Sequence, residues 1–161
     1  MKKQGFTLIE LMVVIVIMGI LAAVAVPKLF GMIAKSKASE IGPAAGEYVK
    51  LQDAYVAESG TKVGNWKMIG YNMNNSTSFT YDQDALTAET TKLEGLSKTS
   101  AWKATAQAKL NDCKSGSTWT ISVAENKTET GSTGSPLVYT PEYSDKTNCD
   151  ALTPNFLKIG Q

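Results

Sequence analysis

One carboxylate lies inside a long apolar stretch near the start of the chain. Residues 6–26 form a run of 21 residues in which only Thr7, Glu10 and Gly19 are not plainly apolar. As a helix with a rise of about 1.5 Å per residue, this run is about 30 Å long, the thickness of the hydrocarbon core of a bilayer. A carboxylate at that depth costs about 3 kcal/mol, so Glu10 requires a partner. Two roles fit it: it pairs with a positive charge, or it caps the positive end of the helix dipole.

The rest of the chain offers few groups for catalysis or metal binding. Its 161 residues carry a net charge of +1, and all 16 basic residues are Lys, with no Arg and no His. The commonest general base and metal ligand is therefore missing, as is the usual bidentate phosphate clamp. No nucleophile–base pair, phosphate loop or metal-ligand cluster is visible. We expect no catalytic residue, no cofactor, no metal site and no nucleic-acid binding.

The N-terminus allows two interpretations. Lys2 and Lys3 precede the apolar run and favour the cytoplasmic side, which places the rest of the chain outside the membrane. In the first interpretation the run stays on the protein as an anchor. In the second it is a secretory signal cut after Ala25, within an A-x-A pattern, and the product is a secreted binding module. The position of Glu10, the length of the run and its continuation into a helical pattern favour the anchor.

A long helix is predicted from residue 6 to residue 59. After an apolar segment, residues 6–27, the pattern becomes amphipathic over residues 28–59, with apolar positions recurring at steps of three and four. One stripe is expected to pack on a globular head and the other to face water or neighbouring subunits. Four residues are expected to weaken or bend the rod: Gly19, Pro27, Gly42 and Pro43.

Residues 60–161 are expected to form the head. Alternating apolar and polar residues predict strands at 102–110 and 119–124, and a third strand is expected at 137–140. A fourth strand near residues 156–159 and a short helix within 85–96 are also predicted. Consecutive strands with short links form an antiparallel meander, and its apolar face would cover the amphipathic helix. The fold class is therefore α+β, with a long N-terminal helix packed on a small antiparallel sheet.

Two cysteines, Cys113 and Cys149, occur in the head. In an exported domain one disulfide between them is the simplest interpretation, and two buried free thiols are the alternative. The bond would tie the C-terminal segment to the sheet.

Residues 1–30 closely resemble the N-terminus of type IV pilins and of the related pseudopilins of type II secretion. The family pattern is a short basic leader ending in Gly, then Phe, then T-L-I-E-L, here Gly5, Phe6 and Glu10. The resemblance implies a leader of residues 1–5, cleavage between Gly5 and Phe6 by a prepilin peptidase, and N-methylation of Phe6. It also implies that the new amine of an incoming subunit meets Glu10 of a neighbour, and that the helix can melt locally near Gly19 and Pro27.

The resemblance implies a structural subunit and not an enzyme. The subunit would be held in the inner membrane as a single-pass protein and then polymerise into an extracellular filament for adhesion, twitching motility or DNA uptake. Its expected partners are other copies of itself, the peptidase, the assembly platform and minor pilins. A major pseudopilin is the alternative, and the disulfide favours a pilin because major pseudopilins usually lack it. A calcium loop at Asp145 and Asp150, similar to that of major pseudopilins, is a weaker alternative for the C-terminal segment.

Overall fold

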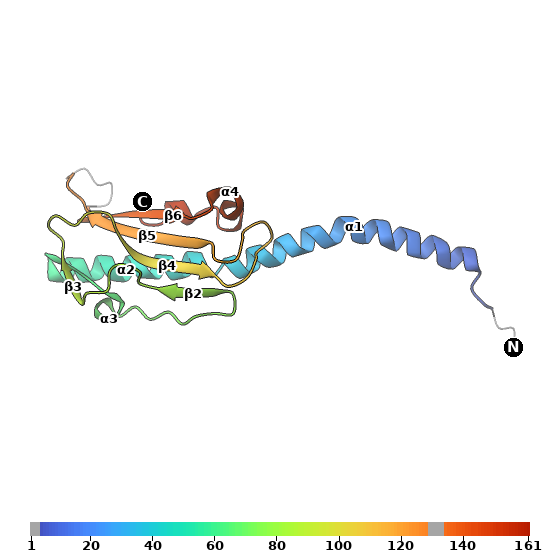
Figure 1. Cartoon of the computed structure of the whole chain (residues 1–161), viewed down its shortest axis with the longest axis horizontal. Helices are drawn as coiled ribbons and strands as arrows, with labels where there is room; N and C mark the ends of the chain where they lie inside the picture. The colour runs from blue at the N-terminus through green and yellow to red at the C-terminus, as the bar shows by residue number, and fades with distance from the viewer. Residues whose placement is uncertain (1–3, 129–133) are drawn as a thin grey trace.

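A helical rod and a compact head make up the molecule (Figure 1). The computed structural model describes residues 4–128 and 134–161. Helix α1 (Leu8–Ala38) extends far beyond the head at its N-terminal end, and helix α2 (Ile41–Ser59) continues along nearly the same line beneath the sheet. The prediction of a long N-terminal helix is confirmed, with its start at Leu8 and its end capped by Gly60 in the left-handed conformation.

The rod is interrupted between α1 and α2. Pro43 has no N–H to donate to the carbonyl of Ser39, four residues earlier, and its ring crowds that carbonyl. The carbonyl of Ser39 therefore lacks its helical partner. At the same residue, the amide of Ser39 donates to the carbonyl of Ser36 at 3.3 Å and closes a turn that is tighter than an α-helical turn. Pro27 lies inside α1 without ending it. The rod predicted as one helix is therefore two helices joined by a turn at Ser39 and Glu40.

The head contains a four-stranded antiparallel sheet of order β2-β4-β5-β6. Its strands are β2 (Phe79–Asp82), β4 (Thr99–Ala106), β5 (Thr118–Glu125) and β6 (Leu137–Tyr143). The predicted meander is confirmed in β4, β5 and β6, which pair in sequence order. Strand β2, which the sequence did not predict, adds to the other edge of β4.

Shorter elements complete the head. Strands β1 (Lys62–Gly64) and β3 (Thr90–Lys92) form a second, two-stranded sheet. The short helices are α3 (Trp66–Ile69) and α4 (Lys146–Cys149), and the 3-10 turns are η1 (Asp150–Leu152) and η2 (Phe156–Lys158).

Three predictions of local structure are wrong in part or in whole. The short helix expected within residues 85–96 is replaced by turns and β3, because the Leu86 amide bonds to the carbonyl of Ser100 and β3 pairs with β1. The strand expected near 156–159 is the 3-10 turn η2. The strand expected at 102–110 lies instead at Thr99–Ala106, and residues 110–113 form a tight turn in which the Leu110 amide donates to the carbonyl of Cys113.

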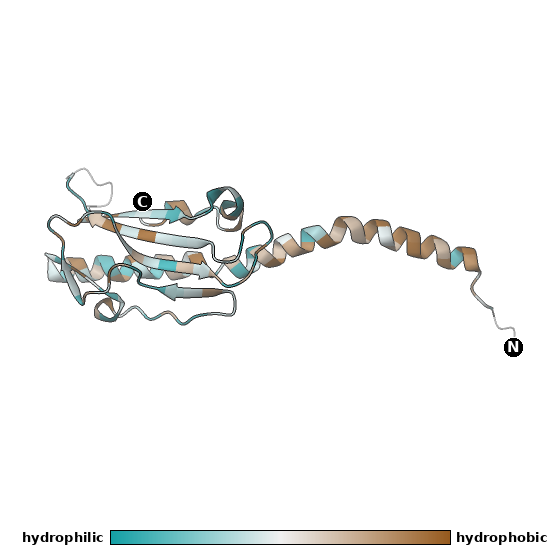
Figure 2. Ribbon diagram, in the orientation of Figure 1, coloured by the Kyte–Doolittle hydropathy of each residue, from teal (hydrophilic) through white to brown (hydrophobic). Residues whose placement is uncertain are grey.

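The core lies between α2 and the sheet. On the helix side the buried residues recur at helical spacing: Ile41, Ala44, Ala45, Tyr48, Val49, Gln52 and Val56. The sheet contributes large side chains that are also fully buried, among them Trp102, Trp119 and Ile121. Figure 2 shows the contrast along the rod, with apolar residues on all sides of α1 and a mixture of polar and apolar residues along α2.

Candidate assembly site

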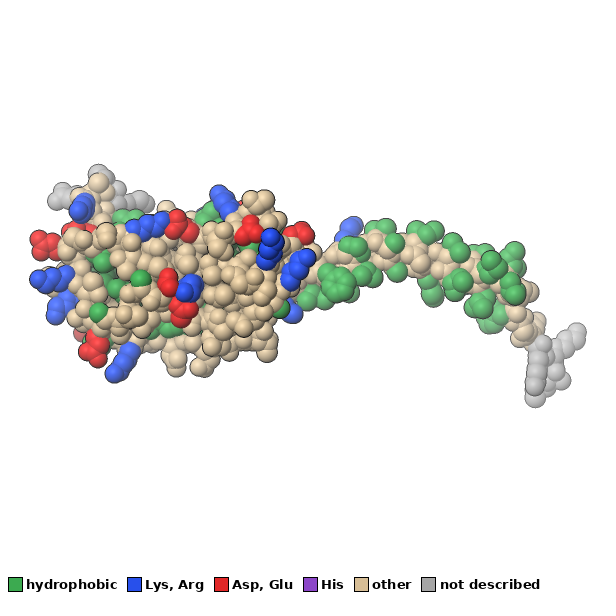
Figure 3. All heavy atoms as spheres, viewed as in Figure 1, with side chains coloured by type: hydrophobic (Ala, Val, Ile, Leu, Met, Phe, Trp, Pro, Cys, Tyr) green, Lys and Arg blue, Asp and Glu red, His purple; other side chains and the backbone are tan. Residues whose placement is uncertain are grey.

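Over residues 8–27, helix α1 is apolar on all sides apart from Glu10 in its first turn, and the rest of the described chain leaves it uncovered. Every residue from Leu8 to Phe30 is exposed, and the helix is long and apolar enough to cross a membrane. Figure 3 shows hydrophobic side chains on every visible side of the projecting helix. A helix without a polar face is stable only inside a membrane or an assembly of subunits. This segment of α1 is therefore the candidate assembly site.

Glu10 lies in the first turn of α1 and forms a capping box with Thr7. The Thr7 amide and hydroxyl both donate to Glu10 Oε2 at 2.7 Å, and the Glu10 amide donates to the Thr7 hydroxyl at 3.3 Å. Such a pair satisfies N–H groups that a helix start leaves open. Within one subunit, Glu10 thus has the capping role that the sequence allowed, and Thr7 is a partner that the sequence reasoning missed. The signal was present as the T-x-x-E spacing before an apolar run.

Gly5 and Phe6 precede the helix in exposed backbone without regular secondary structure. Phe6 is 92% exposed, and nothing lies within 4 Å of the position where a side chain on Gly5 would begin. In the part of the chain that the structure describes, no hydrogen bond or ion pair joins Phe6 to Glu10. The predicted leader runs over residues 1–5, of which Lys2 and Lys3 lie outside the described residues. The bond between Gly5 and Phe6 is sterically open to a protease.

Glu40 fixes the junction of the rod to the head. Its Oε1 accepts hydrogen bonds from the Ser76 hydroxyl at 2.5 Å and from the Tyr81 hydroxyl at 2.7 Å. Burial and the contact with Glu40 both raise the pKa of Tyr81. In the sequence, Glu40 is one of the polar positions of the amphipathic pattern over residues 28–59. A carboxylate just before a Gly-Pro interruption was the available signal.

The two cysteines are bonded to each other, as predicted, so the free-thiol alternative is wrong. The Cα atoms of Cys113 and Cys149 are 4.9 Å apart, and the bond spans 36 residues of sequence. It joins the tight turn at residues 110–113 to helix α4. That turn is closed by the Leu110 amide, which donates to the carbonyl of Cys113 at 2.8 Å.

Asp145 serves as the N-cap of α4. Its carboxylate accepts from the amide and the side chain of Asn148, and these hydrogen bonds lower the pKa of Asp145. Among the described residues no three His, Cys, Asp or Glu side chains are grouped closely enough to hold a metal ion. The structure therefore gives this carboxylate a capping function.

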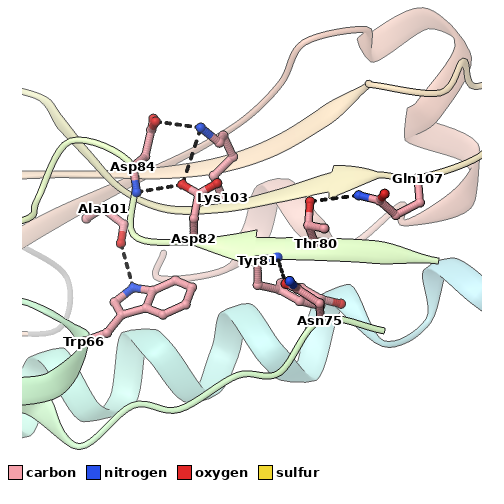
Figure 4. Close-up of polar contacts among 9 residues, drawn as sticks. All are labelled: Trp66, Asn75, Thr80, Tyr81, Asp82, Asp84, Ala101, Lys103 and Gln107. Carbon is pink, nitrogen blue, oxygen red and sulfur yellow. Dashed lines mark hydrogen bonds and ion pairs between the residues drawn. The ribbon is translucent and has the colours of Figure 1, made fainter. Parts of the chain in front are cut away.

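On the outer face of β2 and β4, hydrogen bonds and ion pairs join side chains of the two strands (Figure 4). Lys103 lies between Asp82 and Asp84, at 3.4 Å and 2.7 Å, and the hydrogen bond from Lys103 lowers the pKa of Asp84. On the other side of β2, the indole of Trp66 donates to the carbonyl of Ala101 at 3.0 Å. These contacts join neighbouring segments and have no catalytic geometry.

Comparison with known proteins identifies the N-terminal segment. Residues 1–26 match the family model described as the prokaryotic N-terminal methylation motif. The chain is 56% identical over 39 residues to the type IV major pilin protein PilA of Myxococcus xanthus (strain DK1622). This match covers 24% of this chain and 18% of that protein. It is 49% identical over 45 residues to a type IV major fimbrial protein FimA of Dichelobacter nodosus, covering 28% and 29%. It is also 49% identical over 53 residues to the type II secretion system core protein G of Escherichia coli (strain K12), covering 33% and 34%.

The methylation motif, the uncovered membrane-length helix and the α+β head together resemble the arrangement of a pilin. The similarity to major pilins and fimbrial proteins supports a type IV pilin. The chain matches only about a fifth to a third of the length of these three relatives. The family model covers residues 1–26 alone, so the head must be interpreted from its own structure.

Proposed function

We propose that this chain is a structural subunit of a type IV pilus, which polymerises through α1 into an extracellular filament for adhesion, twitching motility or DNA uptake. The observation that carries the proposal is the apolar surface of α1, which is exposed on all sides and holds a single carboxylate in its first turn. A packed bundle of such helices in a filament core would cover this surface. Before assembly, the inner membrane would cover it instead.

Processing at Gly5 and Phe6 is part of the proposal. A prepilin peptidase cuts between these residues and methylates the new amine of Phe6, and the assembly platform and minor pilins then act on the mature subunit. The exposed, non-helical backbone at Gly5 and the match to the methylation motif support this order. The chain itself has no part in the chemistry and serves as the substrate.

Glu10 is proposed to set the register of assembly. Its Oε2 is occupied by Thr7, while Oε1 accepts no hydrogen bond from the described residues. The protonated amine of Phe6 on an incoming subunit, whose reference pKa is about 8, can therefore bind Oε1 of a neighbour. A buried pair of this kind adds little net stability, but a helix displaced by one turn leaves two unpaired charges, which is strongly unfavourable.

Three variants separate pairing from capping. Glu10→Gln keeps an oxygen that can accept from Thr7 but removes the charge, and Glu10→Ala removes both. Thr7→Ala removes the capping hydroxyl and keeps the carboxylate. We expect both Glu10 variants to reduce the yield of sheared filaments by about 100-fold, because one buried charge loses its partner. The Thr7 variant should retain most of its filaments, since a cap contributes about 1 kcal/mol.

Membrane insertion provides the control for these variants. The amount of chain in the membrane fraction should be unchanged or higher in Glu10→Ala, because a charge has been removed from an apolar helix. Equal losses of insertion and of filaments would contradict the register role. Normal filaments from Glu10→Gln would show that capping is the only role of Glu10.

Local weakness of the rod is also proposed to be functional. Gly19 and Pro27 lie in the exposed part of α1, where no contact with the head supports the helix. Gly42 and Pro43 lie next to the turn between α1 and α2, whose position Glu40 fixes. We infer that the segment from Gly19 to Pro27 unwinds first when a filament is stretched, and that the second pair bends the rod.

The similarity to a type II secretion core protein makes a major pseudopilin the second candidate. Filaments sheared from the cell surface that contain this chain would favour a pilin, and their absence, together with loss of secretion in a deletion strain, would favour a pseudopilin. N-terminal sequencing excludes or supports the remaining alternative of a secreted module. A mature start at N-methylated Phe6 supports the pilin type, and a start at Val26 defeats it.

A further inference from the structure

A cleft of about 450 Å³ lies where α1 leaves the head. Its apolar walls are Phe30 and Ile33 of α1 and Leu110 of the tight turn that the disulfide holds. The polar part of the lining comes from Lys37, Lys109 and Asn111. Lys37 lies one turn farther along α1 than Ile33, and Lys109 lies beside Leu110. The volume is within the usual range for small-ligand sites, and the lining combines an apolar surface with a few polar groups as such sites do.

The two lysines are electrostatically unbalanced. Neither Lys37 nor Lys109 forms an ion pair with a carboxylate anywhere in the part of the chain that the structure describes, where the ion pairs involve Lys98 and Lys103. The nearest acid in sequence is Asp112, which follows Asn111 in the turn and accepts from its amide at 3.4 Å. Neither lysine is therefore paired in the part of the chain that the structure describes, and Asp112 is the one acid of the turn itself.

More lysines lie at the same end of the head. Lys28 and Lys35 of α1 precede and follow the apolar residues of the cleft. Figure 3 shows several basic side chains, with acidic ones among them, around the point where the helix emerges. The closest other acid on the rod is Glu40, whose Oε1 is already bound to Ser76 and Tyr81. An anion with an apolar part is the ligand that fits these surroundings.

The length of α1 places the cleft at a membrane surface. From Leu8 to Lys28 the helix rises about 30 Å, which is the thickness of the hydrocarbon core. Phe30 and Ile33 then lie at the boundary with the headgroups, and Lys37 lies about 6 Å beyond Ile33. This step rests on the proposed function, because it requires that α1 is held in the membrane before assembly.

We propose that the cleft binds an anionic phospholipid of the outer leaflet. The phosphate lies between the ammonium groups of Lys37 and Lys109, and the upper part of an acyl chain lies against Phe30, Ile33 and Leu110. One bound lipid would fix the rotation and the height of the head above the bilayer while the subunit waits for assembly. The disulfide contributes by holding Leu110 over the helix.

The test measures lipid binding by the full chain in a mild non-ionic detergent. Phosphatidylglycerol and phosphatidylcholine are titrated separately, and bound lipid is counted by native mass spectrometry. The variant is Lys37→Gln with Lys109→Gln. Its matched control is Lys62→Gln with Lys92→Gln, which removes the same charge from β1 and β3, strands that do not line the cleft. All four lysines are exposed, so each double variant should unfold at the same temperature as the parent.

We expect the parent to prefer phosphatidylglycerol and the cleft variant to lose about 25-fold in affinity for it, at about fivefold per lysine. The control variant should bind like the parent. Glycerol phosphate added as a soluble competitor should displace the lipid only weakly, since it lacks the acyl chain.

Several results would overturn the proposal. Equal affinity for the two lipids, or equal losses in both double variants, would show that general charge and not the cleft is responsible. Glycerol phosphate that binds as tightly as the lipid would identify a simple anion site. Unchanged lipid binding with loss of filaments in the cleft variant would show that a neighbouring subunit fills the cleft.

The failure of this proposal can be told apart from a failure of the proposed function. A chain that binds phosphatidylglycerol in the cleft but never forms filaments keeps the lipid site and loses the pilus role. A mature chain that begins at Val26 has no membrane helix, and both ideas then fail together, as N-terminal sequencing would show first.

Discussion

Helices α1 and α2 lie nearly in line, yet the more apolar of the two is the exposed one. In α1 only Ala34 and Ala38 are buried, both close to the head, whereas α2 buries seven residues along one stripe. Burial within the chain thus follows the presence of a sheet to pack against and not the apolar content of the helix. The surplus apolar surface of α1 can be covered only from outside the chain.

The largest expected difference comes from one matched pair of substitutions. Ile41 is 0% exposed in α2 and Ile17 is 52% exposed in α1. We expect Ile41→Ala to reduce the free energy of unfolding of the head by about 4 kcal/mol, because it leaves a cavity, and Ile17→Ala to change it by less than about 0.5 kcal/mol. Urea unfolding of the full chain in detergent, followed by the fluorescence of the buried tryptophans, measures both. Similar losses in the two variants would show that α1 and the head unfold as one unit.

Removing the disulfide should weaken the head alone. Cys113→Ser with Cys149→Ser opens a loop of 36 residues, which lowers the free energy of unfolding by about 3 to 4 kcal/mol in the chain-entropy model. The amide exchange of α1 should stay as it is in the parent. Faster exchange at residues 8–28 would show that the bond supports the rod as well.

The two prolines of the rod should respond differently to replacement. Pro27 interrupts the interior of α1, so Pro27→Ala should stabilise that segment by about 3 kcal/mol and slow amide exchange at residues 23–28. Pro43 lies in the first turn of α2, where amides lack helical partners in any case. Pro43→Ala should therefore change exchange much less. Equal effects would contradict the assignment of a break between the two helices.

Alkaline conditions should unfold the head and leave α1 helical. Burial is the main cause that raises the pKa of Tyr71 to about 12, from 10, and burial also raises the pKa values of Tyr48, Tyr81 and Tyr139. The unfolded chain loses these protons above pH 10 while the folded head keeps them. The stability is therefore complete below pH 10 and decreases from pH 10 toward pH 12, by about 1.4 kcal/mol per pH unit for each such tyrosine. Circular dichroism in detergent at rising pH measures this, and a stable head at pH 12 would contradict it.

The smallest effect concerns one hydroxyl in the core of the head. The hydroxyl of Tyr48 is buried and has no hydrogen-bond partner among the described residues, whereas that of Tyr81 donates to Glu40. Tyr48→Phe should stabilise the head by about 1 kcal/mol, because it removes an unsatisfied polar atom, and Tyr81→Phe should destabilise it by a similar amount. Thermal unfolding of the two variants at pH 7 gives the comparison. Destabilisation in both would mean that a partner for Tyr48 forms in solution.

Sequence patterns predicted the elements whose signal is local. The apolar run of α1, the helical spacing of α2 and the alternation in β5 all extend over enough residues to define their period. Strands β1, β2 and β3 have three or four residues each, and partners far along the chain decide their conformation, as in the pairing of Phe79 with Ala106. Phe156 was predicted in a strand because it is apolar, but its amide bonds to the carbonyl of Thr153 and closes a turn.

The residues of the candidate site also fall into two groups: those that the sequence identifies and those that only the fold brings together. Gly5, Phe6 and Glu10 are contiguous in sequence, and a motif can identify them. The bond between Cys113 and Cys149 was accessible because a chain with two cysteines allows only one pairing. The bonds from Ser76 and Tyr81 to Glu40 cross 36 and 41 residues, and the cleft joins α1 to a turn more than 70 residues away. Only the folded chain brings such groups together.

The attachment of Glu40 also decides how the subunit carries mechanical load. Tension along α1 reaches the head at the turn between the helices, where the side chain of Glu40 is fastened to β2 and the segment before it. The end of α1, where Ala34 and Ala38 are buried, and α2 supply the remaining contacts. These contacts run parallel to the pull, so they are loaded in shear and must yield together and not one after another. The exposed part of the rod has no such support and should lengthen first, while the head stays intact.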